Sequence, residues 1–222
     1  MDLTYHLALS LKEQICVIIG LGEVGQRKLT GLLATDVAYV HLFDPQLQAS
    51  ILPKDPRIRI YRRSYTIEDL RPALLVFACT NDTQENLRIA TLCRKLHVLC
   101  NCTSTPTAGN VFIPATIRQD DLTLTIATGG ASPALTRKWH EELSLWMQKR
   151  RAMLKFMGRL RPLLLALGKS SQENRALFRT LVHGPLEELL SAKNWQEALS
   201  YLKSTLPQAL HKDLEVLLHD LP

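Results

Sequence analysis

The sequence has no apolar run that approaches the roughly 20 residues needed to span a membrane. Its longest apolar runs are ICVIIG and LLVFAC. The first residues also lack the basic region and apolar core of a signal peptide. We therefore expect a cytoplasmic protein that does not enter a membrane. With 222 residues, 46% of them hydrophobic and 22% charged, it should form one large domain and a smaller one.

Cysteine is scarce, and its spacing excludes the common cysteine-based sites. There is no CxxC pair and no Cys/His spacing of the kind that binds structural zinc. An odd number of cysteines in apolar segments predicts reduced, buried thiols rather than disulfides. We expect no bound metal. The five positions are Cys16, Cys79, Cys93, Cys100 and Cys102.

Acidic residues are outnumbered by basic ones. The net charge of +6 and the pI of about 9.2 suit either a nucleic acid or a small polyanionic substrate. Between Lys149 and Arg161 lie six Lys or Arg and no acid, with aliphatic residues at helical spacing. This run is either a solvated helix face or a surface that gathers anions. A reading-helix motif and interleaved aromatics are missing, so we do not expect nucleic-acid binding.

Short apolar runs alternate with helical patterns in the first half of the chain. Helical patterns at 23–34 and 83–96 are interspersed with strand-like segments at 14–20, 37–43, 73–79 and 97–102. This alternation predicts an α/β fold with a Rossmann-like parallel sheet and helices on both faces.

The pattern changes after Asn110. One more strand, 121–128, precedes a helix for which Ser132 and Pro133 provide the N-cap and the first helical residue. The remaining sequence predicts an α-helical C-terminal domain. Its helical segments are 151–167, 171–184, 185–204 and 207–221.

The first strand ends in GLGEVGQRK, which places Gly20, Gly22 and Gly25 at GxGxxG spacing between a strand and a helix. The first glycine allows a tight turn, the second lets a pyrophosphate approach the backbone, and the third lets helix and strand pack closely. The next strand ends at Asp44, 24 residues after Gly20, where a carboxylate would bind an adenosine ribose and repel a 2′-phosphate. The pattern favours NAD as the cofactor. The alternative is a sheet whose glycines only ease packing, with Asp44 as a turn residue before Pro45.

Four motifs occur in the order CVIIGLGEVGQRKLTGLL, FACTND, NCTSTPTAGNVFIPA and DLTLTIATGGASPALTRKWHEEL. Over roughly residues 1–150, they resemble the siroheme synthase N-terminal module, the precorrin-2 dehydrogenase and sirohydrochlorin ferrochelatase family. The resemblance implies an NAD-binding Rossmann domain at 1–112, a dimerisation region at 113–150, a helical C-terminal domain at 151–222, and a homodimer. It implies hydride transfer from precorrin-2 to NAD, giving sirohydrochlorin, and in some members insertion of ferrous iron.

The resemblance also assigns binding residues. Besides the three glycines, those that would contact NAD are Glu23, Val24, Asp44, Pro45, Thr80 and Asn81. Those that would bind the tetrapyrrole are Asn101, Thr128, Gly129, Gly130 and Ser132. Residues 128–132 would offer backbone N–H groups to a substrate carboxylate, or they form a plain strand-to-helix turn. For Thr80 and Asn81 the alternative is likewise a turn or a helix cap.

The chain departs from the family at its catalytic position. The family's Asn-Val-Val-Asp becomes Asn101-Cys102-Thr103-Ser104, so Ser104 stands where the catalytic aspartate is expected. A serine hydroxyl does not accept a proton at neutral pH unless a base activates it.

Other side chains are candidates for the missing chemistry. His97 and His140 can replace the aspartate as proton acceptor, unless they are surface histidines. Cys100 and Cys102 would share a strand face with Ser104 and could then act as soft iron ligands, unless they are core cysteines.

We therefore predict an NAD-dependent precorrin-2 dehydrogenase, an oxidoreductase of siroheme biosynthesis with weak or absent ferrochelatase activity. Hydride transfer depends mainly on holding the substrate against the nicotinamide. Loss of acid–base assistance, worth about 10² to 10⁴ in rate, then slows the reaction without abolishing it. The alternative is a catalytically silent carrier that binds NAD or a tetrapyrrole and passes it to a partner enzyme.

Overall fold

The computed structural model describes residues 4–47 and 52–222. The chain divides into two compact units, a first unit of residues 1–113 and a second unit of residues 114–222. Each unit has its own buried apolar core. None of the helices formed by the described residues combines the length and the apolar composition that a membrane crossing requires.

The first unit is built on a five-stranded parallel sheet in the order β3-β2-β1-β4-β5. The strands are β1 (Ile15–Ile19), β2 (Tyr39–Phe43), β3 (Ile58–Tyr61), β4 (Ala73–Ala78) and β5 (Leu99–Cys102). The strand order reverses beside β1, so the carboxyl ends of β1 and β4 border the crevice where open α/β sheets bind their ligands. The predicted α/β fold with a Rossmann-like parallel sheet is confirmed.

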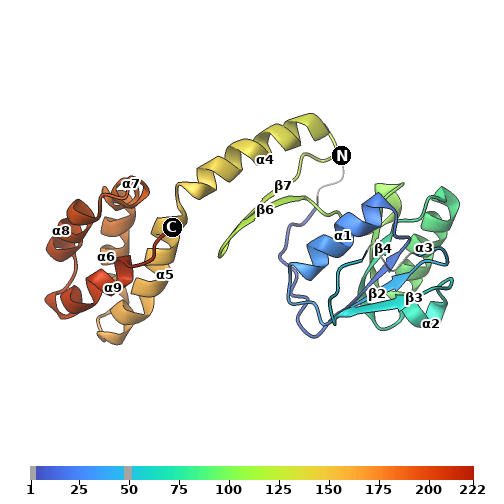
Figure 1. Ribbon diagram of the computed structural model, residues 1–222, viewed down its shortest axis with the longest axis horizontal. Helices are drawn as coiled ribbons and strands as arrows, with labels where there is room; N and C mark the ends of the chain where they lie inside the picture. The colour runs from blue at the N-terminus through green and yellow to red at the C-terminus, as the bar shows by residue number, and fades with distance from the viewer. Residues whose placement is uncertain (1–3, 48–51) are drawn as a thin grey trace. The chain divides into compact units, whose positions relative to one another are not determined.

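The central strands β1 and β4 are buried on both faces, and the side chains that alternate along them enter two different cores. Cys16 and Ile18 of β1 pack in one core with α1 (Glu23–Leu33). Val17 and Ile19 pack in the other core with α2 (Ile67–Leu70) and α3 (Thr83–Leu96). Figure 1 shows helices α1, α2 and α3 around this sheet. Burial on two faces explains why β1 and β4 read as unbroken apolar runs.

The cysteines are free thiols in these two cores. Burial raises the pKa of Cys16 to about 12 and that of Cys79 to about 11, so both stay protonated and serve as apolar packing groups. Cys100 and Cys102 pack against α3, and β5 ends at Cys102. Ser104 therefore lies beyond the strand, and the expected shared strand face of Cys100, Cys102 and Ser104 is wrong.

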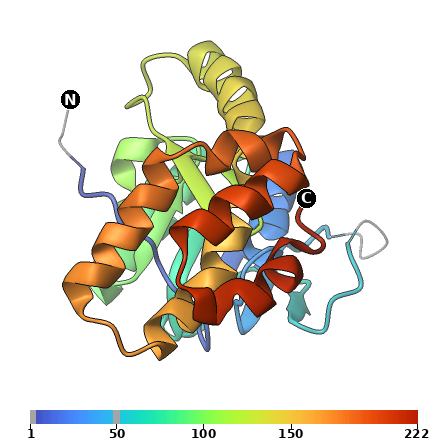
Figure 2. The same ribbon diagram turned by 90° about the vertical axis from the view of Figure 1, so that its left-hand side faces the viewer.

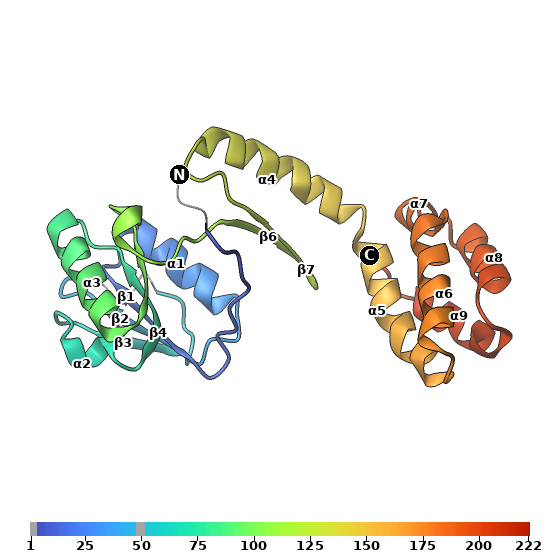
Figure 3. The same ribbon diagram turned by 180° about the vertical axis from the view of Figure 1, so that it is seen from behind.

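The second unit begins with an antiparallel hairpin of β6 (Ala115–Gln119) and β7 (Leu122–Ile126), which packs against α4 (Pro133–Gln148) (Figure 3). Ser132 caps α4 by accepting a hydrogen bond from the N–H of Leu135, and Pro133 is the first helical residue, as predicted.

The rest of the second unit is helical (Figure 2). Its core is made of fully buried side chains such as Phe156, Leu160, Leu181 and Leu202. The predicted α-helical C-terminal part is confirmed. The helices are α5 (Arg151–Ala166), α6 (Ser171–His183), α7 (Leu186–Ser191), α8 (Trp195–Thr205) and α9 (Leu214–Leu218).

Two predicted helices are shorter than expected. The segment 185–204 divides into α7 and α8, because Lys193 adopts a left-handed conformation (φ 57°) and Asn194 starts a new helix by accepting from the N–H of Glu197. The segment 207–221 begins with a 3₁₀ turn, Gln208–Asp213, before α9.

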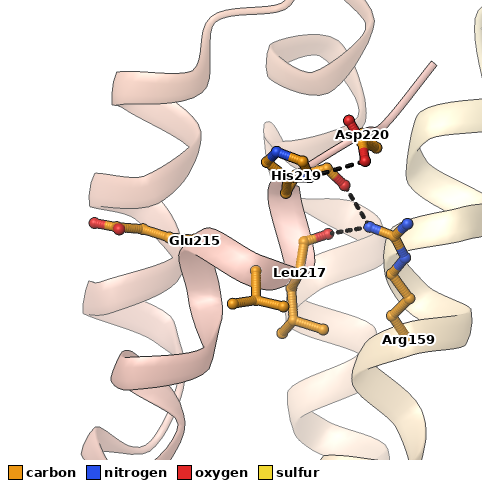
Figure 4. A pocket seen from close by; sticks show the side chains of 6 residues that line it. Arg159, Glu215, Leu217, His219 and Asp220 are labelled. Atoms are coloured by element: carbon orange, nitrogen blue, oxygen red, sulfur yellow. Dashed lines mark hydrogen bonds and ion pairs between the residues drawn. The ribbon is translucent and has the colours of Figure 1, made fainter.

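Several cations between Lys149 and Arg161 bond within the second unit. Arg151 pairs with Asp120 at 2.7 Å. Lys155 and Arg159 donate to carbonyl oxygens at the end of α9, where Figure 4 shows the Arg159 guanidinium against its acceptors. Cations are favourable at this end of a helix because its last carbonyls lack intrahelical partners. These residues are therefore part of the packing of the fold.

Candidate functional site

The glycine turn follows β1 at the carboxyl edge of the sheet. Gly20 has a φ of 87°, and a Cβ there would lie 2.7 Å from the carbonyl oxygen of Cys79, so only glycine fits. A Cβ on Gly25 would overlap the carbonyl oxygen of Gly20. At Gly22, by contrast, a Cβ would meet nothing within 4 Å. Gly20 and Gly25 are thus required by packing, whereas Gly22 leaves bare backbone facing open space.

The N-terminus of α1 opens onto this turn. Gly22 is the N-cap residue and no side chain caps the helix. The N–H of Gln26 is bonded to the carbonyl of Gly22, whereas the first N–H groups of a helix, here those of Glu23, Val24 and Gly25, have no intrahelical acceptor. Together with the helix dipole, these groups suit an anionic phosphate. The chain therefore has the cradle that a dinucleotide pyrophosphate needs.

Asp44 joins the end of β2 to the glycine turn. Its Oδ2 accepts a hydrogen bond from the N–H of Leu21 at 2.9 Å, and its Oδ1 accepts one from the N–H of Gln46, also at 2.9 Å. Each carboxylate oxygen has a further lone pair for a ligand hydroxyl. Asp44 is half-buried and Pro45 beside it is exposed. The predicted ribose-binding position is thus next to the predicted phosphate-binding turn.

A buried asparagine that sequence reasoning missed connects the ends of β4 and β5. The side-chain Oδ1 of Asn86 accepts from the N–H and the hydroxyl of Thr80 at 3.0 and 2.8 Å. Its Nδ2 donates to the carbonyl of Thr80 at 2.9 Å and to the hydroxyl of Ser104 at 3.2 Å. Asn86 is fully buried, at the same helical spacing as Ile89 and Cys93. That spacing was the signal that could have identified it.

Ser104 is exposed at the lip of this edge. Its hydroxyl lies 3.9 Å from the sulfur of Cys102, in addition to its bond with Asn86. The hydroxyl of Thr103 donates to the carbonyl of Ala78 at 2.8 Å, so it is directed into the sheet and not toward a ligand at this edge. Among the described residues, the hydrogen-bond partners of Ser104 include no carboxylate or imidazole. The arrangement can position a ligand but does not activate the serine as a base.

Asn101 lies one residue before the end of β5. Its Nδ2 donates to the carbonyl of Val111 at 2.9 Å, and its buried Oδ1 has no partner in the described part of the chain. Asn101 is the register partner of Phe77, and the ammonium of Lys28 lies 5.7 Å from the centre of the Phe77 ring. Burial lowers the pKa of Lys28. Lys28, which sequence reasoning did not select, places a cation on the side of the sheet that carries Phe77.

The other predicted residues lie at separate places. Asn81 is exposed beside Thr80. His97 adopts a left-handed conformation at the end of α3, before β5 begins, whereas Ser104 follows the other end of that strand. His97 is thus at the wrong end of β5 to accept a proton at Ser104, which corrects that expectation. His140 belongs to α4 in the second unit.

The predicted substrate-binding turn also belongs to the second unit. Gly129 and Gly130 have φ values of 59° and 81°, and the carbonyl of Thr128 accepts from the N–H of Ala131 at 3.0 Å. The hydroxyl of Thr128 lies 3.2 Å from that of Thr136 in α4. With Ser132 as N-cap, this segment is a tight turn into a helix, which leaves the start of α4 as a place for an anionic group.

Comparisons with known proteins agree with this geometry. Residues 7–115 match a family described as "Putative NAD(P)-binding". The siroheme synthases of Nitrosomonas europaea and Nitrosomonas eutropha are 26% and 27% identical over 207 and 211 residues, which is 89% and 91% of this chain. The alignments cover 42% and 43% of those proteins, so the chain spans about two fifths of the length of the curated relatives it matches.

A solved structure is similar over most of the chain. It is that of SirC, precorrin-2 dehydrogenase, with a TM-score of 0.68 and 24% identity. The similarity covers 90% of this chain and 100% of that one. At this level of identity the likeness is one of fold.

Proposed function

Because the chain belongs to the siroheme synthase N-terminal module family, we propose that it is a precorrin-2 dehydrogenase that transfers hydride to NAD and forms sirohydrochlorin. The observation that carries the proposal is the open glycine turn beside Asp44. Bare backbone at Gly22, an uncapped helix start and a carboxylate at the end of β2 together fit a dinucleotide.

Two features favour NAD over NADP. The Asp44 carboxylate would repel a 2′-phosphate on the ribose. Arg63, which follows β3, donates from its two terminal guanidinium nitrogens to the Asp69 carboxylate at 2.7 and 2.9 Å, and it also lies over the Phe43 ring. This arginine is therefore already neutralised and is a poor partner for an added phosphate.

Bound NAD would supply the hydride acceptor, and the chain's own residues would orient the substrate. Asn101, the turn of Thr128, Gly129 and Gly130, and Ser132 remain the proposed substrate contacts, and we add Lys28 as a cation for a substrate carboxylate. A homodimer formed through residues 113–150 is part of the same proposal.

Ser104 sets the proposed limits of the activity. With Asn86 and Cys102 as its neighbours, the serine neither takes nor relays a proton, so the proton released on oxidation leaves to water or to a substrate carboxylate. Hydride transfer continues at a reduced rate. Iron insertion depends more strongly on the missing carboxylate, so it is weak or absent.

The same serine motivates a second candidate function. A protein that binds NAD or a tetrapyrrole and passes it on without chemistry would also tolerate the loss of a catalytic carboxylate. An NAD carrier needs the same cradle at Gly22, whereas a tetrapyrrole carrier needs only the proposed substrate contacts, and neither converts the substrate.

A turnover measurement separates the two functions. Purified protein is mixed with freshly prepared precorrin-2 and NAD, and NADH is followed by absorbance, with NADP in a parallel sample and the Asp44→Ala variant as control. NADH formation above the protein-free rate, lost in the variant, supports the dehydrogenase. Tight tetrapyrrole binding without NADH formation supports the carrier and overturns the dehydrogenase.

A further inference from the structure

Helices α5 and α6 of the second unit form a surface hollow of about 420 Å³ that we call the α5–α6 hollow. Three guanidinium groups line it, from Arg161 on α5 and from Arg175 and Arg179 on α6. The described residues that line it include no Asp or Glu. The hollow is thus a concentration of positive charge without a local counter-charge.

The acids nearby in sequence do not neutralise it. Helix α5 contains no acid, and the acid of α6, Glu173, is bonded to the N–H and hydroxyl of Ser170 at 3.0 and 2.7 Å in a capping box. Arg175 and Arg179 form no ion pair with any residue of 4–47 or 52–222. Like charges held close together without a partner are destabilising, so an anion in the hollow would be favourable.

A second hollow in the same unit shows the contrast. It measures about 580 Å³ and is lined by Arg159 together with Glu215 and Asp220 (Figure 4). Its arginine already donates to the carbonyls of Leu217 and His219. In that hollow the arginine has hydrogen-bond acceptors and the lining includes two acidic residues. The α5–α6 hollow has no acidic residue in its described lining, and Arg175 and Arg179 have no ion-pair partner there.

The α5–α6 hollow also has apolar and polar features that restrict its ligand. The Arg161 guanidinium lies 5.5 Å from the centre of the Phe178 ring, and Leu165 and Val182 at the rim are 50% and 54% exposed. Asn174, also in the lining, is 6% exposed and its Oδ1 has no partner among the described residues. A matching ligand combines an apolar body with several oxyanions.

We propose that the α5–α6 hollow binds a small polycarboxylate with an apolar, ring-shaped body. Guanidinium groups bind carboxylates through paired hydrogen bonds, and the volume is in the range of small-molecule sites. The candidate ligand, a tetrapyrrole polycarboxylate, rests on the proposed function. The hollow is then a second tetrapyrrole site, located in the second unit. It would exist in addition to the proposed substrate site near Ser104, at the carboxyl edge of the sheet in the first unit.

The probe is uroporphyrin, a fluorescent porphyrin polycarboxylate, added to the whole chain. The test variant is Arg175→Gln/Arg179→Gln, and the matched control is Lys203→Gln/Lys212→Gln, which removes two exposed positive charges from other parts of the second unit. Binding is measured by fluorescence titration, and hydrogen exchange of residues 171–183 reports on the hollow itself.

We expect uroporphyrin to protect residues 171–183 in the wild type and in the control. In the test variant this protection should vanish and the affinity of that site should fall about tenfold or more. Equal protection in the test variant overturns the proposal, and so does ATP binding at the same residues as tightly as uroporphyrin, which would assign the hollow to phosphate esters. NADH formation from precorrin-2 tests the dehydrogenase separately. The hollow can prove not to bind uroporphyrin while NADH is still formed, and it can bind uroporphyrin in a protein that forms no NADH.

Discussion

Asn86 donates a hydrogen bond to the hydroxyl of Ser104 across 3.2 Å, from the first turns of α3 to the lip beyond β5. The same amide holds Thr80, so one buried side chain sets the relative positions of two strand ends. A donor is therefore already aimed at the position where the family has its catalytic carboxylate.

Restoring that carboxylate should raise the activity. In Ser104→Asp the Asn86 amide can donate to the new carboxylate, which can accept the proton released on oxidation. We expect a gain in kcat for NADH formation of about tenfold or more, within the range of general-base assistance, and measurable iron insertion into sirohydrochlorin. Ser104→Asn, which has similar size without the base, is the control. Equal rates in both variants would mean that the proton leaves by another route.

Removing Asn86 should loosen both strand ends. Asn86→Ala leaves the part-buried N–H and carbonyl of Thr80 without their side-chain partner, which should lower the free energy of unfolding by about 1–3 kcal/mol. Urea denaturation measures the change. The exposed neighbour Gln84→Ala is the control and should differ little from the wild type. An unaltered stability of Asn86→Ala would show that water replaces the amide at no loss.

Substitutions at two glycines of the turn, Gly22 and Gly25, should separate the effect on binding from the effect on folding. Gly22→Ala adds a Cβ in open space at a φ of −62°, so the melting temperature should hardly change while dinucleotide affinity falls about tenfold or more. Gly25→Ala should unfold the protein, because its Cβ overlaps the Gly20 carbonyl. Gly31→Ala, also with nothing within 4 Å, is the control and should stabilise α1 by about 0.5–1 kcal/mol. NAD binding is measured by calorimetry. An unchanged affinity in Gly22→Ala would show that the glycine turn is not part of the NAD-binding site.

Asp44 should determine both affinity and coenzyme choice. Asp44→Ala removes the carboxylate that would bind the ribose and that accepts from Leu21. Loss of a charged hydrogen bond of about 1.5–3 kcal/mol corresponds to roughly ten- to hundredfold weaker NAD binding. NADP should be affected less, so the preference for NAD narrows. Calorimetric titration with both coenzymes tests this, with Asp121→Ala in the second unit as control.

Acid should weaken the corner between β3 and α2. Hydrogen bonds from Arg63 lower the pKa of Asp69 from 3.8 to about 2, so between these values the unfolded chain binds more protons than the native one. This contribution to stability is present above pH 3.8 and is lost as the pH falls through 2. The unfolding free energy of Asp69→Asn should therefore fall less steeply than that of the wild type over this interval in urea titrations. Parallel curves would contradict the assignment.

Much of the fold follows from local sequence. Helix α3 has its predicted bounds, Thr83–Leu96, because Asp82 accepts from two N–H groups at its start and His97 turns left-handed at its end. β3 was not predicted, since IRIY is only four residues long, too short for its alternation to stand out from the surrounding sequence. It forms by pairing with β2 and by stacking of Tyr61 on Phe43 at 4.6 Å, contacts that no local pattern contains.

The site was predictable where it depends on strand ends. Asp44, Thr80 and Ser104 follow parallel strands, whose carboxyl ends share one edge of the sheet. Asn86 was not found, because its role arises when α3 docks on the sheet. The partners of Arg159 lie 58 and 60 residues away, so the charge run alone did not show them.

Lys155 and Arg159 hold the end of α9 through carbonyl oxygens, which every residue type provides. The two sides of this attachment therefore differ in how freely they can drift during evolution. The exposed side chains at positions 219 and 220 can change without removing an acceptor, whereas Leu217 is constrained by its burial in the core and the two cations by the bonds they donate.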